Sequence, residues 1–207
     1  MQGRVITIGR QCGSGGHSIG SELAKRLDVP FYDKEIIEMT AKESGFHPQF
    51  VDEKGEYMES NMLSNLARHL SYAGQGRYEN YQPLQDQIYF SQARIIKELP
   101  EKGPCVIVGR CADHILRDRK DVLNVFIHAD MRFKKKRCVE RKQFSEEDAE
   151  DMIRRRDKLR ADHYRYYTDR KWGDPFNYHL CLDSSMFGIE KCVSIIEDAC
   201  KDMCPAS

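Results

Sequence analysis

The sequence predicts an α/β fold in which helices cover both faces of a parallel sheet. Short runs of β-branched apolar residues alternate along the chain with longer segments of helical periodicity. A loop in which four of eleven residues are glycine follows the first run, and a helical pattern begins directly after it. Parallel strands need crossover connections, so this alternation is typical of parallel sheets. The length of 207 residues fits one domain, residues 1–207.

The first strand and helix have the clearest patterns. Residues 4–9 contain a β-branched apolar run, which predicts a buried strand. Apolar residues recur every fourth position at Ile19, Leu23 and Leu27, so one apolar face predicts a helix over residues 17–27.

The same two patterns continue through the rest of the chain. Apolar runs predict the strands, and residues with helical spacing predict the helices. We expect strands at 29–32, 105–108, 122–127 and 178–182, and helices at 33–44, 84–98, 110–117, 130–142, 145–165 and 188–203. Residues 45–83 are less regular, with a helical pattern around 56–72 and a polar loop at 73–83. This loop is flanked by tyrosines that we expect either to pack or to stack on a base, namely Tyr72, Tyr78, Tyr81 and Tyr89.

Composition excludes several classes of partner. Lys plus Arg and Asp plus Glu number 33 each, so no net charge favours nucleic acid or a membrane surface. The basic run Lys134–Arg137 is expected to lie on an exposed helix face. We expect a cytoplasmic protein, because no signal peptide and no apolar run of membrane-spanning length is visible. The eight cysteines have no metal-type spacing.

The glycine-rich loop after the first strand predicts a phosphate site, most simply for a nucleotide. Glycines let the backbone approach an anion, and free N–H groups at a helix start point toward it. The Walker A pattern places a lysine where this chain has Gly16, and a hydroxyl where it has His17. Arg10 is the nearest cation, and arginines further along the chain are others. The expected phosphate-binding residues are Arg10, Gly13, Ser14, Gly15, Gly16, His17 and Ser18.

Other candidate residues follow the later strands. Ligands of open parallel sheets bind beyond the carboxyl ends of the strands. Asp33 follows the second expected strand, and Arg110 and Asp113 follow the third. Asp33 either caps the helix at 33–44 or contacts a substrate.

Taken together, these landmarks resemble the cytidylate kinase-like branch of the P-loop nucleoside monophosphate kinases. The resemblance rests on the stretches Ile8–Gly16, Phe31–Lys34, Val106–Asp113, Ile153–Asp157 with Arg160, and Trp172–Pro175. It implies a three-layer P-loop NTPase fold with a five-stranded parallel sheet, a helical acceptor-binding lobe near 34–95 and an arginine-rich lid near 145–170.

The resemblance also implies an activity. The chain would transfer the γ-phosphate of ATP, with Mg²⁺, to a small acceptor such as a nucleoside monophosphate. Residues 13–18 would hold the donor phosphates, Arg110 would grip the acceptor, and Arg156 would neutralise the transferring group. Arg160 shares a helical face with Arg156 and is a further catalytic candidate. Asp33 and Asp113 are candidates for acceptor binding.

The sequence departs from true cytidylate kinases at several points. The loop lysine is absent, Asp113 is displaced from the Gly-Arg pair, and lid positions for Asp and Arg are occupied by Arg160 and His163. Val108 offers no carboxylate to Mg²⁺, so the ion would be held by nucleotide and water and no metal-ligating residue is expected. Two alternatives stay open: a non-catalytic nucleotide sensor or interaction module, and a dinucleotide-binding oxidoreductase with Asp33 on a ribose.

Overall fold

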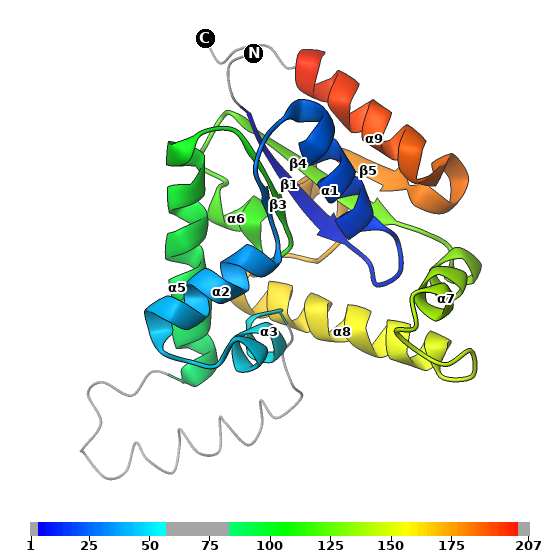
Figure 1. The fold of residues 1–207 in the computed structure, drawn as a ribbon, viewed down its shortest axis with the longest axis horizontal. Helices are drawn as coiled ribbons and strands as arrows, with labels where there is room; N and C mark the ends of the chain where they lie inside the picture. The colour runs from blue at the N-terminus through cyan, green and yellow to red at the C-terminus, as the bar shows by residue number, and fades with distance from the viewer. Residues whose placement is uncertain (1–3, 57–82, 203–207) are drawn as a thin grey trace.

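A computed structural model describes residues 4–56 and 83–202 of the protein (Figure 1). Its centre is a parallel sheet with the strand order β2-β3-β1-β4-β5. The strands are β1 (Val5–Arg10), β2 (Phe31–Tyr32), β3 (Cys105–Val108), β4 (Val122–His128) and β5 (Leu180–Asp183). Dinucleotide-binding folds have the order 3-2-1-4-5-6 instead. The sheet therefore contradicts the oxidoreductase alternative.

Helices form a layer on each face of the sheet, and the fold is a three-layer α/β fold (Figure 1). α1 (Gly16–Leu27) and α9 (Ser184–Asp202) cover one face, and α5 (Leu84–Glu98), α6 (Ala112–Ile115) and α8 (Ala149–Thr168) cover the other. The remaining α-helices pack on these layers: α2 (Lys34–Ser44) and α3 (Pro48–Glu56) against α5, and α7 (Met131–Glu140) against α8. Two short 3-10 helices occupy Leu99–Lys102 and Pro175–Asn177. None of the described helices is both long enough and apolar enough to span a bilayer.

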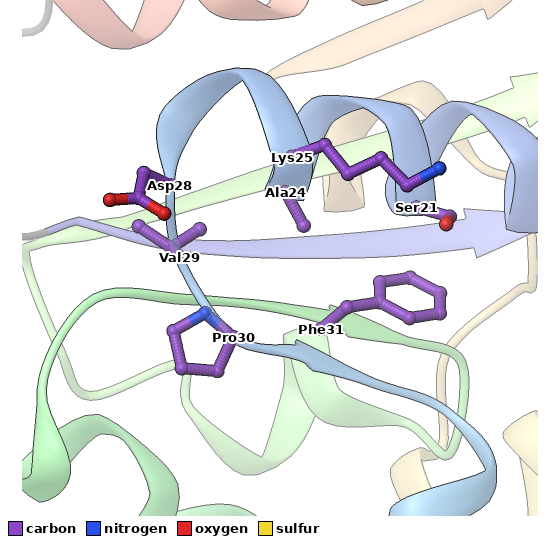
Figure 2. A pocket seen from close by; sticks show the side chains of 7 residues that line it. All are labelled: Ser21, Ala24, Lys25, Asp28, Val29, Pro30 and Phe31. Carbon is purple, nitrogen blue, oxygen red and sulfur yellow. The ribbon is translucent and has the colours of Figure 1, made fainter.

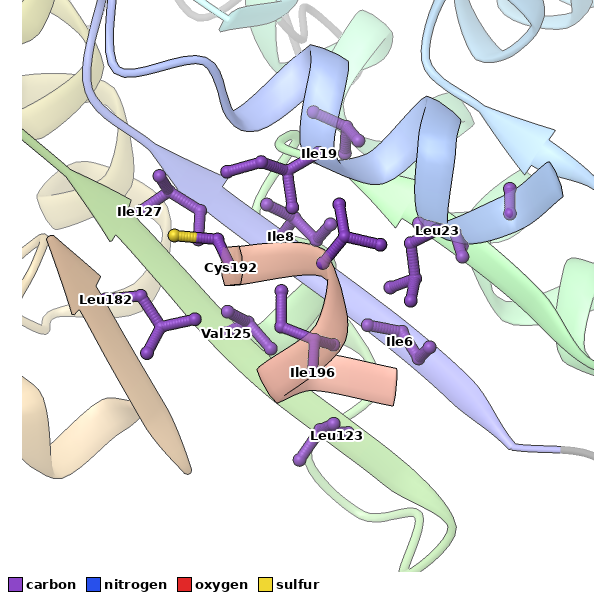
Figure 3. Packing of buried hydrophobic residues seen from close by; sticks show 14 residues of the cluster. Ile6, Ile8, Ile19, Leu23, Leu123, Val125, Ile127, Leu182, Cys192 and Ile196 are labelled. Carbon is purple, nitrogen blue, oxygen red and sulfur yellow. The ribbon is translucent and has the colours of Figure 1, made fainter. Parts of the chain in front are cut away.

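The strands are apolar on both faces because both faces are buried. Val106 and Val108 of β3 join the cluster under α1 and α9, whereas Cys105 and Ile107 join the cluster on the opposite face. Figure 3 shows Ile196 of α9 beside the strands that carry the first cluster. The continuous apolar runs in the sequence follow from this two-sided burial.

Most of the expected elements are present, several with shifted ends, as in α8, which spans Ala149–Thr168 where 145–165 was expected. Three further differences follow. α6 is shorter than the expected helix at 110–117, because Arg110 and Cys111 adopt left-handed backbone angles. α3 forms in a segment expected to be irregular. α9 begins before the expected residue 188, and Gly188 interrupts it with φ 73° and ψ 165°.

One expected region cannot be compared with the structure. The helical pattern around 56–72 and the loop at 73–83, with Tyr72, Tyr78 and Tyr81, lie outside the described residues except for their ends.

Candidate functional site

The glycine-rich loop connects β1 to α1 and presents the uncapped start of that helix. Gly13 and Gly15 have φ values of 76° and 87°, a left-handed conformation that side chains disfavour. No side chain caps the first turn of α1, and no acidic residue lies in it. The loop is braced instead by Ser14, whose hydroxyl donates to the Gln11 carbonyl at 2.8 Å. Uncapped N–H groups with the positive end of the helix dipole make an anion site.

Helix α7 packs directly on this loop. A Cβ on Gly13 would lie 2.8 Å from the Lys134 carbonyl oxygen and 2.9 Å from Cys138 Sγ, so only glycine permits the close approach. Lys134 is buried, and its Nζ lies 3.3 Å from Gln11 Oε1 and 3.3 Å from Asp157 Oδ2. The expectation that Lys134–Arg137 lies on an exposed face is wrong for Lys134 and Arg137, because their side of α7 faces the loop, whereas Lys136 is exposed.

Two arginines reach the start of α1 from this side: Arg137 lies on α7, and Arg141 directly follows the helix. Arg137 Nη2 donates to Ser18 Oγ at 3.3 Å, and Arg141 Nη2 donates to the same oxygen at 2.8 Å. The guanidinium carbon of Arg137 lies 3.4 Å from the position of a Cβ on Gly15. Neither arginine was expected at the loop, although residues 134, 137, 138 and 141 share one helical face.

Arg10 and His17, from the two ends of the loop, both face Asp33. Arg10 Nη2 lies 3.9 Å from Asp33 Oδ1, and His17 Nε2 lies 3.4 Å from Asp33 Oδ2. The Asp33 side chain makes no capping hydrogen bond to α2, so the capping alternative is not observed. The missing side chain of Gly16 leaves room for the Arg10 stem. The Arg10 guanidinium therefore forms an ion pair with Asp33.

Helix α8 contacts the loop through Asp157 and Arg160. Asp157 Oδ1 accepts a hydrogen bond from the Cys12 N–H at 2.6 Å. Burial raises the pKa of the Asp157 carboxyl, while this hydrogen bond and Lys134 oppose the rise. Arg160 Nη1 approaches the Arg10 carbonyl at 3.5 Å. Arg156 instead lies over the Phe144 ring, 4.6 Å from its centroid.

Arg110 forms a second cationic site at the end of β3, which is the neighbour of β1. Gly109, Arg110 and Cys111 have consecutive φ values of 75°, 58° and 55°. Left-handed non-glycine residues are uncommon and tend to mark functional sites. The Arg110 side chain is 1% exposed, and its Nη2 lies 2.8 Å from Asp52 Oδ1 on α3. Its Nε and Nη1 have no hydrogen-bond partner within the described part of the chain.

Gln92 and Gly55 lie beside the free edge of Arg110. Gln92 is 1% exposed, and neither polar atom of its side chain finds a partner among the described residues. A Cβ on Gly55 would lie 2.9 Å from Arg110 Nη1 and would clash with Gln92 Nε2. Gln92 and Gly55 were not predicted from the sequence, whereas Arg110 was. Gln92 does interrupt an apolar stripe with Ile88 and Ile96, and a polar residue on a buried face is a usable signal.

Asp113 lies in α6, three residues after Arg110, and is buried. Its Oδ2 accepts a hydrogen bond from Tyr164 Oη at 2.6 Å. Burial raises the pKa of Asp113, and the Tyr164 hydrogen bond offsets part of the rise. Burial, with the nearby Asp113 charge, also raises the pKa of Tyr164. His163 of α8 is buried beside Cys111, with 3.7 Å between Nδ1 and Sγ.

No group of three or more metal-ligating side chains occurs in the part of the chain that the structure describes. A hollow of about 430 Å³ lies elsewhere, beside the C-terminal half of α1 and β2 (Figure 2). It is lined by Ser21, Ala24, Lys25, Asp28, Val29, Pro30 and Phe31. The glycine-rich loop lies at the other end of α1, so this hollow is separate from the cationic sites.

Solved structures of other proteins share this fold. A crystal structure of an uncharacterized protein from Eubacterium ventriosum ATCC 27560 is 27% identical, covers 96% of this chain and 99% of that chain, and has a TM-score of 0.71. Shikimate kinase from Bacteroides thetaiotaomicron is 14% identical, with coverage of 96% and 98% and a TM-score of 0.54. Shikimate kinase from Acinetobacter baumannii, in complex with shikimate, is 13% identical, with coverage of 95% and 92% and a TM-score of 0.52.

These shikimate kinases share the fold alone, and the expected P-loop NTPase fold is confirmed. No curated protein matches the sequence. The sequence model of the cytidylate kinase-like family matches residues 5–186, which is most of the chain. The protein therefore belongs to the cytidylate kinase-like family.

Proposed function

We propose that the protein is a phosphotransferase of the nucleoside monophosphate kinase type, which moves the γ-phosphate of ATP to a small acceptor. The observation that carries this proposal is the pair of anion sites at the ends of two adjacent strands. The uncapped start of α1 follows β1, and the buried, partly unpaired Arg110 follows β3. A phosphotransferase needs one site for each of its two phosphate-bearing or hydroxyl-bearing substrates, held side by side.

The donor would bind at the glycine-rich loop. Gly13, Ser14, Gly15 and Gly16 supply a backbone cradle, and His17 and Ser18 lie in the first turn of α1. Arg10 would contribute its backbone to this site, while its side chain faces Asp33.

The acceptor would bind against Arg110. A guanidinium presents a fork of N–H donors that matches phosphate or carboxylate, and Arg110 Nε and Nη1 have no hydrogen-bond partner among the described residues. Asp33, held by Arg10 and His17, would supply a carboxylate for an acceptor hydroxyl. Asp113 would act as a positioning residue, because its hydrogen bond with Tyr164 ties α6, which follows Arg110, to α8.

Catalysis would depend on alignment and positive charge, because phosphoryl transfer needs little covalent help from a protein. Arg160 already touches the loop and is the best placed lid residue to stabilise charge on the transferring group. Arg156 would join it after leaving the Phe144 ring. The described residues do not form a Mg²⁺ cage, so the ion would enter with the nucleotide and keep water ligands.

Two acceptor classes follow from the comparisons. Family membership favours a nucleoside monophosphate, and the shared fold of the shikimate kinases extends the choice to a small hydroxylated acid. Since ATP is an intracellular metabolite, the proposed activity belongs in the cytoplasm.

A second candidate function is a nucleotide sensor without turnover. The absent loop lysine and the engagement of the Ser18 hydroxyl by two arginines favour it. Incubation with γ-labelled ATP, Mg²⁺ and a panel of nucleoside monophosphates, nucleosides and small hydroxy acids, shikimate among them, separates the two. An enzyme labels one acceptor catalytically. ATP binding without any labelled product would contradict the phosphotransferase and support the sensor.

A further inference from the structure

One face of α7 and the residue that follows it are directed at the glycine-rich loop. The positions 134, 137, 138 and 141 follow the i, i+3, i+4, i+7 spacing of a single helical face. Lys134 and Cys138 contact the loop at Gly13. Arg137 lies beside Gly15, and Arg137 and Arg141 both reach Ser18. The contact at Gly13 thus fixes where the two arginines project.

These two arginines carry positive charge that no nearby carboxylate neutralises. Within residues 4–56 and 83–202, neither guanidinium forms an ion pair with an Asp or Glu. Lys134, on the same face, is paired with Asp157, and Arg10 faces Asp33. Lys134 and Arg10 therefore face carboxylates, whereas Arg137 and Arg141 donate to the neutral Ser18 hydroxyl.

The electrostatics at Arg137 agree with this geometry. Burial and the neighbouring Arg141 lower the pKa of Arg137, and Glu140 only partly opposes them. Two like charges that converge on one neutral hydroxyl repel each other, and an anion bound between them would relieve the repulsion.

We propose that Arg137, assisted by Arg141, replaces the missing loop lysine and binds the polyphosphate of the donor. This inference rests on the proposed function, because it assumes that the loop holds a nucleoside triphosphate. Gly16 stands at the lysine position and has no side chain to offer. The cation would come instead from Arg137 of α7, whose guanidinium carbon lies 3.4 Å from the position of a Cβ on Gly15.

An arginine suits this position better than a flexible lysine would. Its planar fork binds two phosphate oxygens at once, and its guanidinium carbon lies over the Phe133 ring, 5.6 Å from the centroid. The Ser18 hydroxyl keeps both guanidinium groups aimed at the start of α1. When polyphosphate binds, its oxygens offer these groups charged acceptors in place of one neutral hydroxyl.

The test is a calorimetric titration of the full-length protein with Mg²⁺-ATP and, separately, with inorganic tripolyphosphate. Tripolyphosphate lacks the base and the sugar, so it isolates the polyphosphate contact. We expect Arg137→Ala to weaken the binding of both ligands by a similar factor, about 10- to 100-fold, as for the loss of charged hydrogen bonds. Arg141→Ala should weaken both less, and Arg137→Lys should restore part of the affinity.

Lys136→Ala is the matched control, because Lys136 is exposed and pairs with Glu140. It should bind both ligands like the wild type. Arg137→Gln keeps most of the aliphatic stem and provides a second neutral variant if Arg137→Ala does not fold.

Each other outcome has a distinct meaning. Unchanged tripolyphosphate binding in a folded Arg137→Ala or Arg137→Gln variant overturns the inference and leaves the proposed function standing. Weaker ATP binding with unchanged tripolyphosphate binding also overturns it, because Arg137 would then contact the base. A wild-type protein that binds neither ligand contradicts the proposed function itself.

Discussion

The Asp52 carboxylate forms an ion pair with Arg110, with 2.8 Å between Oδ1 and Nη2. The two partners are unequally buried, since the Arg110 side chain is 1% exposed and the Asp52 side chain is 55% exposed. A buried guanidinium needs a counter-charge, and Asp52 supplies it from a helix at the surface. In the proposed function, the anionic group of the acceptor takes over this role.

Asp52→Asn should lower the KM for the acceptor by about twofold to fivefold, with kcat nearly unchanged. The variant removes a competing carboxylate, and a half-exposed ion pair contributes up to about 1 kcal/mol. Steady-state kinetics at saturating ATP measure the change. Glu38→Gln, an exposed acid on α2, is the control. A higher KM in Asp52→Asn would instead make Asp52 a direct acceptor ligand.

Gly55→Ala should raise the KM for the acceptor about tenfold or more without weakening ATP binding. The added Cβ would clash with Gln92 Nε2 and lie 2.9 Å from Arg110 Nη1, at the edge where we propose that the acceptor binds. The clash with a buried side chain is expected to lower thermal stability, because it outweighs the helix propensity gained with alanine. Thermal unfolding and kinetics are measured on the same preparation. An unchanged KM in a folded variant would show that the acceptor does not contact this edge of Arg110.

Stability should depend on pH through Asp113. Burial raises the pKa of this carboxyl in the folded state, so the folded protein holds the proton more tightly than the unfolded chain does. The contribution of Asp113 to stability therefore falls as pH rises from about 4, the ordinary value for Asp, through the raised value. Asp113→Asn removes this titration.

Urea unfolding at several pH values between about 3.5 and 7 checks the sign. The free energy of unfolding of the wild type minus that of Asp113→Asn should fall as pH rises. Asp118→Asn, at a position 88% exposed, should give a flat difference. A difference that is flat or rises for Asp113→Asn would contradict the burial argument.

The two lid arginines should differ in their effect on turnover. Arg160→Ala should lower kcat by about 100-fold, since this side chain already reaches the loop. Arg156→Ala should lower it less, about tenfold, because Arg156 must first leave Phe144. Saturation kinetics give both values, with the exposed Arg155→Ala as control. The reverse order would place Arg156, and not Arg160, on the transferring group.

The sequence predicted the part of the fold in which local pattern and burial agree. Local structure is specified by the β-branched run of β1, by the glycines of the loop and by the apolar residues at every fourth position of α1. The central strands are buried on both faces of the sheet, in agreement with their continuous apolar sequence. The loop could be predicted because glycine adopts positive φ without a steric penalty, so a cluster of glycines after a strand indicates such a loop from the sequence alone.

Sequence reasoning failed where tertiary packing decides. The basic run in α7 reads as a solvated face, and only its contact with Gly13 turns Lys134 and Arg137 inward. Asp52 and Gly55 lie far in sequence from Arg110, in a segment without clear periodicity. The left-handed Arg110 and Cys111 were also missed, because neither residue type normally favours that conformation.

The most direct test of the account is acceptor-dependent phosphoryl transfer by the wild type and by Arg110→Ala, with the ATP dissociation constant measured for both. We predict transfer to one acceptor by the wild type, a loss of kcat/KM of at least about 100-fold in Arg110→Ala, and equal ATP binding in the two proteins. Equal transfer by both proteins, or no transfer by the wild type to any acceptor, would contradict the account.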